Sequence, residues 1–270
     1  MAWLLPLEFF PQPAVPPKSR RDALDSIGNL MQISAVILII LLAICRRLLS
    51  STTSNSNPRT KTLFGEPLPA IIIVISCLSI ALATGAFIIP KDSLARDYMF
   101  FTRLPAQILA SLLPLHVLLS HSSPLSPLPW LLDMSRPALI PYHRVLGWSF
   151  MALFTMHAVM YLNFYIGVGI LGMKLWASNV QLGLALSVVM VSVGLAARRS
   201  FRKKINQTGT NNWIVGHIIG AMVVGGLLWG HVVQTRTFVW QAAAIAGVGV
   251  AWRLRRVIGR NLGDEDRKTV

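Results

Sequence analysis

The sequence predicts an all-α membrane protein, a polytopic bundle of about seven transmembrane helices. Of its 270 residues, 54% are hydrophobic and only 13% are charged, whereas soluble domains carry about 25% charged residues. The mean hydropathy is +0.59, and several apolar runs approach the roughly 20 residues that a helix needs to cross a bilayer. These observations argue against a soluble enzyme, a disordered tail and a nucleic-acid-binding protein.

The basic residues and the cysteines agree with a membrane protein. The formal net charge is +15, which would suit a polyanion-binding protein only if the basic residues shared one solvated face. They lie instead in short blocks between apolar runs, as in polytopic membrane proteins. Cys45 and Cys77 lie in or beside apolar runs, so they predict no disulfide framework, CxxC pair or zinc site. We therefore expect a lipid bilayer as a partner and no nucleic acid.

Seven apolar runs are predicted to span the membrane. The third is the weakest because Pro105 and Pro114 interrupt it, but membrane helices tolerate proline when neighbouring groups satisfy the freed carbonyls. The alternative is a six-span chain in which this segment is re-entrant. A Pro-rich tail, residues 1–26, precedes the first span without a signal-peptide pattern. The predicted spans are residues 27–45, 68–89, 104–120, 143–165, 179–197, 213–233 and 237–256.

The distribution of Lys and Arg predicts the orientation. The connections after the first, third, fifth and seventh spans carry about twice as many Lys and Arg as the opposite side. Cytoplasmic connections are enriched in these residues. The sequence therefore predicts an external N-terminus and a cytosolic C-terminus, with a transmembrane domain over residues 27–258 and a short cytosolic tail over residues 259–270.

Four histidines share one spacing on two predicted helices. His143 and His157 are 14 positions apart on the fourth span, and His217 and His231 are 14 positions apart on the sixth. Fourteen residues bring each pair nearly onto one helix face, about 40° apart, and separate the two rings by ~21 Å along the axis. Both spans cross the membrane in the same direction. We therefore expect His143 and His217 at the cytosolic level, and His157 and His231 at the outer level.

Two facing imidazoles at each of two levels are typical of two b-type haems. Each haem iron takes two axial nitrogens from opposite sides of a planar ring. A zinc site requires ligands that converge on one ion, which histidines ~21 Å apart on one helix cannot do. A proton relay would normally include Asp or Glu, and all ten acidic residues fall in predicted tails or loops. The predicted metal and cofactor ligands are therefore His143, His157, His217 and His231.

Other residues near these histidines have two possible roles each. Arg144 could pair with a haem propionate or could be an interfacial anchor. The glycines of the sixth span could admit a porphyrin or could form a helix-packing face. For His116 and His121, near the end of the third span, we favour hydrogen bonding to a neighbouring helix. The glycines are Gly216, Gly220, Gly225, Gly226 and Gly230.

The segment Tyr142-His143-Arg144-Val145-Leu146-Gly147-Trp148, followed by His157, resembles the HRxxG…H segment of the ferric reductase-like transmembrane domain. The family includes fungal ferric reductases and NADPH oxidases. The basic stretch 198–204 before His217 and the Arg-rich exit 252–256 are similar too, so the resemblance covers roughly residues 95–258, with a bis-haem core over 104–258. It implies electron transfer from NADPH and FAD on the cytosolic side through an inner haem (His143 and His217) and an outer haem (His157 and His231).

The resemblance is limited to the haem-bearing membrane portion. Ten residues follow Arg260, too few to hold a flavin, so we expect FAD and NADPH on a partner chain, a cytosolic dehydrogenase. A Gly167-x-Gly169-x-x-Gly172 match follows a helix rather than a strand, so it does not predict a dinucleotide site. We expect an integral protein of the plasma membrane or an endomembrane that acts as a ferric reductase-like oxidoreductase subunit. The alternatives are a membrane oxidoreductase recruited to a biosynthetic pathway and a non-catalytic scaffold or remnant.

Overall fold

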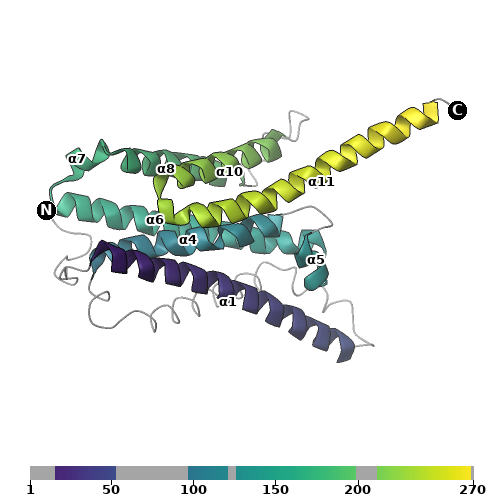
Figure 1. Ribbon diagram of the computed structural model, residues 1–270, viewed down its shortest axis with the longest axis horizontal. Coiled ribbons are helices and arrows are strands. Elements are labelled where there is room, and N and C mark those ends of the chain that lie inside the picture. The colour runs from purple at the N-terminus through teal and green to yellow at the C-terminus, as the bar shows by residue number, and fades with distance from the viewer. Residues whose placement is uncertain (1–15, 53–96, 121–125, 199–211, 269–270) are drawn as a thin grey trace.

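The computed structural model describes residues 16–52, 97–120, 126–198 and 212–268, and these form helices and their connections without a strand. This confirms the predicted all-α fold class. Six long helices lie side by side along the molecule (Figure 1), and α11 continues well beyond the others. The long helices are α1 (Pro17–Thr52), α4 (Tyr98–Ser120), α6 (Arg136–Gly167), α8 (Ser178–Ala196), α10 (Asn212–His231) and α11 (Arg236–Lys268). The short ones are α5 (Pro127–Leu131), α7 (Leu171–Leu175) and the 3-10 turn η3 (Val233–Thr235).

Five of the described helices, α1, α4, α6, α8 and α10, are long and apolar enough to cross a membrane. They coincide with five of the predicted spans, two of which extend one or two residues beyond the ends of α8 and α10. The predicted span 237–256 lies within α11, which is not among these five, and the predicted span 68–89 lies outside the described residues. The predicted total of seven spans therefore stays a prediction.

The proline-containing α4 is the central helix of the bundle. It packs against α1, α6 and α11, and 56% of its apolar window is buried, compared with 6% in α8 and in α10. Pro105 and Pro114 both lie inside this continuous helix of 23 residues. The structure thus favours a spanning helix over the re-entrant alternative. Burial explains why this helix tolerates its prolines. Proline has no backbone N–H to donate, and neighbouring helices surround the carbonyl groups that lose this partner.

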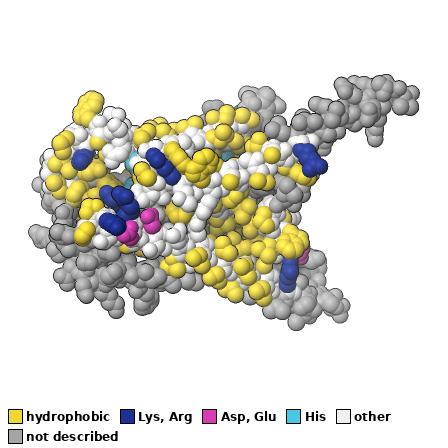
Figure 2. All heavy atoms as spheres, viewed as in Figure 1, with side chains coloured by type: hydrophobic (Ala, Val, Ile, Leu, Met, Phe, Trp, Pro, Cys, Tyr) yellow, Lys and Arg dark blue, Asp and Glu magenta, His cyan; other side chains and the backbone are white. Residues whose placement is uncertain are grey.

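The outward faces of the other helices are apolar. Val188 on α8 and Met222 on α10 have exposed fractions of 68% and 71%. Figure 2 shows hydrophobic side chains over the middle of the molecule, with the charged side chains gathered toward its two ends. A wide apolar belt between charged ends is the surface of an integral membrane protein.

Contacts near the helix ends establish the relative directions of the helices. The starts of α1 and α4 meet, whereas α4 and α6 run antiparallel, as do α8 and α10. Consequently α1, α4, α8 and α11 run one way, and α6 and α10 run the other, in the predicted alternation. Which end faces the cytosol stays a prediction. The contacts are Arg20–Asp97, Thr102–His157, His116–His143, Asn179–His231 and Trp229–Trp240.

Candidate functional site

The structure brings the predicted histidines together between α6 and α10. The ring centroids of His143 and His217 are 6.4 Å apart, and the rings are inclined at 75°. At the other level, His231 lies close enough to His157 for an electrostatic interaction between the two rings. The parallel course of α6 and α10 explains this pairing, because equal spacing on two parallel helices gives two matched levels.

The distance between His143 and His217 fits two axial ligands on one metal. A metal–imidazole bond is about 2 Å long, so two imidazoles bound on opposite sides of one metal have centroids roughly 6 Å apart. Among the described residues, no group of three or more His, Cys, Asp or Glu side chains is arranged to hold a metal ion. Two imidazoles at this separation suit a group that brings its own equatorial ligands and takes two from the protein, as haem does.

Backbone carbonyls orient three of the four rings through Nδ1. A carbonyl can only accept a hydrogen bond, so each of these Nδ1 atoms carries the proton and each Nε2 keeps its lone pair. Metal-binding histidines are usually held this way. The pairs are His143 Nδ1 to the His116 carbonyl at 3.0 Å, His157 Nδ1 to the Thr102 carbonyl at 2.6 Å, and His231 Nδ1 to the Asn179 carbonyl at 2.6 Å.

His217 is the exception. Its Nδ1 is buried and has no hydrogen-bond partner in the described part of the chain. An unpaired buried polar group costs about 1–3 kcal/mol, and a histidine within a membrane helix is a functional candidate by default. The ring therefore has hydrogen-bonding or ligating capacity that the described residues do not use.

Two of the five glycines of α10 lie against α8. A Cβ on Gly220 would overlap the Cγ2 of Val193, and a Cβ on Gly230 would lie 3.4 Å from Leu182. Both contacts are with α8, so these glycines let the two helices approach closely. In contrast, a Cβ on Gly216 or Gly226 would meet nothing within 4 Å. Between the two interpretations of these glycines, contact with α8 supports helix packing for Gly220 and Gly230.

Sequence reasoning missed the glycine that matters most for a histidine. A Cβ on Gly183 of α8 would lie 2.9 Å from Cε1 of His231. Gly183 follows Asn179 by four residues, so the missing side chain lets the imidazole reach the Asn179 carbonyl. No sequence pattern marked Gly183, because the ring that it accommodates comes from another helix.

His116 differs from its prediction. Its ring stacks on His143, with centroids 4.0 Å apart and an interplanar angle of 16°, and its buried Nδ1 has no hydrogen-bond partner among the described residues. The prediction of a hydrogen-bonded ring was therefore wrong for Nδ1. The sequence did offer one signal for the contact with His143. His116 lies near the end of a predicted span antiparallel to the one that begins at His143, so both rings lie at the same level. His121 lies outside the described residues.

Arg144 extends from α6 directly after His143, and its side chain is exposed. This position is compatible with a contact to a propionate at the inner level and with an interfacial anchor. Neither role is tested by the structure, so the assignment of Arg144 to a cofactor stays a prediction.

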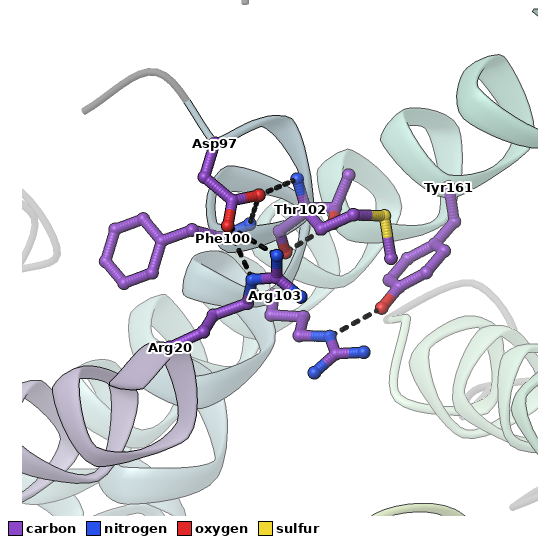
Figure 3. A network of polar contacts seen from close by, with 7 residues as sticks. Arg20, Asp97, Phe100, Thr102, Arg103 and Tyr161 are labelled. Carbon is purple, nitrogen blue, oxygen red and sulfur yellow. Dashed lines mark hydrogen bonds and ion pairs between the residues drawn. The ribbon is translucent and has the colours of Figure 1, made fainter. Parts of the chain in front are cut away.

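A polar network that the sequence did not indicate (Figure 3) lies beside His157. Asp97 forms a 2.6 Å ion pair with Arg20 and accepts hydrogen bonds from the backbone N–H groups at the start of α4. Arg103 donates through Nε to the Tyr161 hydroxyl at 3.0 Å, and the Tyr161 ring meets His157 edge-on at 4.9 Å. A guanidinium group is thus held one residue away from His157.

Comparisons with known proteins agree with this architecture. Residues 106–228 match the model of the family described as ferric reductase like transmembrane component. The match includes His116, His143, His157 and His217, and it ends three residues before His231. No curated protein and no solved structure matches the chain. Over residues 106–228, this integral membrane protein is therefore similar to the ferric reductase like transmembrane component family.

Proposed function

We propose that the chain transfers electrons across the membrane through two b-type haems, as an oxidoreductase subunit. In this proposal His143 and His217 hold the inner haem, and His157 and His231 hold the outer one. The pairing of imidazoles at two levels of α6 and α10 carries the proposal, together with the carbonyls that orient three of the four rings. The family match supports a transmembrane oxidoreductase role.

The protein's own groups have three tasks in this proposal. The carbonyls of α4 and α8 keep Nδ1 of His143, His157 and His231 protonated and leave the lone pair of each Nε2 available for a metal. The apolar outer faces of the helices exclude water and ions from that space. When bound, a bis-histidine haem supplies a one-electron iron couple whose potential depends on its ligands and on burial.

Charged residues near each level would complement anionic groups. Arg103, held by Tyr161, lies beside the outer pair, and Arg144 lies beside the inner pair in sequence. Guanidinium groups pair well with carboxylates, so we assign each of them a haem propionate as its partner. FAD and NADPH would be held by a separate dehydrogenase chain.

The first test is a reduced-minus-oxidised absorbance spectrum of the purified full chain, with haem quantified per polypeptide. We expect about two b-type haems per chain, one for each pair of axial histidines. His157→Ala and His231→Ala should each remove one haem. Met156→Ala is the matched control, because this α6 neighbour has an exposed fraction of 47% and should leave both haems in place.

Two results would overturn the proposal. A chain that is helical and monodisperse in detergent but contains no haem would eliminate electron transfer through haem. Unchanged haem content in both His157→Ala and His231→Ala would eliminate the ligand assignment at the outer level.

A further inference from the structure

His116 touches His143 in two ways. Its backbone carbonyl accepts the hydrogen bond from His143 Nδ1 at 3.0 Å, and its ring lies parallel to the His143 ring with centroids 4.0 Å apart. The ring also packs against Phe150, at 4.8 Å between centroids. Gly147 leaves the space for it, because a Cβ there would lie 3.3 Å from Cε1 of His116. The sequence thus provides a fitted place for this ring.

Stacking alone does not explain why residue 116 is a histidine. A phenylalanine would fill the same place between His143 and Phe150 without a buried polar atom. The Nδ1 of His116 is instead buried and without a partner in the described part of the chain, which costs about 1–3 kcal/mol. A ring nitrogen retained at such a cost in a membrane helix indicates a use for that nitrogen.

The two histidine levels differ in the number of imidazoles. At the inner level the described residues supply His116, His143 and His217, and at the outer level only His157 and His231. The three inner rings do not form a three-ligand metal centre, since no described group of three or more such side chains could hold an ion. If the inner level holds a haem, three imidazoles are available there for its two axial positions.

We propose that His116 is a reserve axial ligand of the inner haem, able to take the position of His143. This inference rests on the proposed function. The displacement needed is about the 4.0 Å that separates the two stacked rings, which lies within the reach of a histidine that rotates about its two side-chain torsions. Among the described residues the outer level has no such reserve, because the ring beside His157 on α6 is that of Tyr161. The inner site should accordingly tolerate loss of one ligand that the outer site does not.

The test compares equivalent ligand deletions at the two levels in the full chain. Haem per polypeptide and the low-spin electron paramagnetic resonance spectrum are the readouts. His143→Ala should keep about two haems with bis-imidazole signals, whereas His157→Ala should keep about one. The double variant His143→Ala/His116→Phe should lose the inner haem. His116→Phe alone should keep both, because His143 and His217 remain in place.

The outcomes separate this inference from the proposed function. If His143→Ala loses one haem as His157→Ala does, or if the double variant keeps both, the reserve-ligand role is overturned while the two-haem proposal stands. A wild-type chain without haem would overturn both. His143→Leu provides a second deletion that better preserves side-chain volume. If both His143 variants fail to fold while His157→Ala folds, the inference also fails, because a replaced ligand should retain the haem and its stabilisation.

Discussion

Gly183→Ala should disturb His231 more than an alanine at any of the glycines of α10. The new Cβ would lie 2.9 Å from Cε1 of His231 and 3.5 Å from both ring nitrogens. Carbon atoms pack best at about 3.5–4.0 Å, so the ring must move by roughly 0.6–1 Å. It cannot move freely, because its Nδ1 is held by the Asn179 carbonyl at 2.6 Å.

The expected cost is that of overpacking, about 1–3 kcal/mol. Alanine also improves helix propensity by up to about 1 kcal/mol, which would partly hide the effect. Gly226→Ala provides the correction, since it adds the same methyl to a helix at a point where nothing lies within 4 Å. The difference between the two variants therefore isolates the contact with His231.

The assay is thermal unfolding of both variants in the same detergent, followed by helical circular dichroism and by haem absorbance. Gly183→Ala should be less stable than Gly226→Ala by about 1–3 kcal/mol and should alter the spectrum assigned to the outer haem. Equal stability and identical haem spectra of the two variants would refute the close approach of His231 to the α8 backbone.

Two further predictions concern the bundle. Arg20→Met should destabilise the protein by about 3–5 kcal/mol, because it leaves the Asp97 carboxylate, whose exposed fraction is 3%, without its cationic partner. Asp97→Asn should lower the free energy of unfolding by less, since the asparagine side-chain oxygen can still cap α4. Unfolding measurements in detergent that rank the two variants in the opposite order would contradict this. Gly220→Leu should separate α8 from α10, because its Cβ would overlap Val193, whereas the Cβ of Gly216→Leu meets nothing within 4 Å. Unfolding curves that shift equally for both leucine variants would contradict this helix contact.

Some features of the fold were predictable because they depend on local composition and periodicity. Apolar run length predicted five helices that coincide with five of the seven proposed spans, and the structure confirms the all-α membrane class. The third span was the least certain, because proline weakens an isolated helix. Its central position in the bundle compensates, and that position is a property of the packed structure.

The candidate site divides in the same way. The spacing of 14 residues between His143 and His157, and between His217 and His231, indicated matched levels because the rise and rotation per residue are the same in every α-helix. The haem assignment follows from that regularity and stays a prediction. The spacing did not reveal which backbone carbonyls hold the rings, since those carbonyls belong to α4 and α8.

The sequence by itself determined that this is a helical membrane protein with two equally spaced histidine pairs, because hydropathy and helical periodicity act between residues near each other along the chain. Only the tertiary structure placed the His116 ring on His143, and Gly183 beneath His231. These contacts join residues 27 and 48 positions apart on different helices. Such contacts depend on how side chains interlock when the helices pack, which no local pattern encodes.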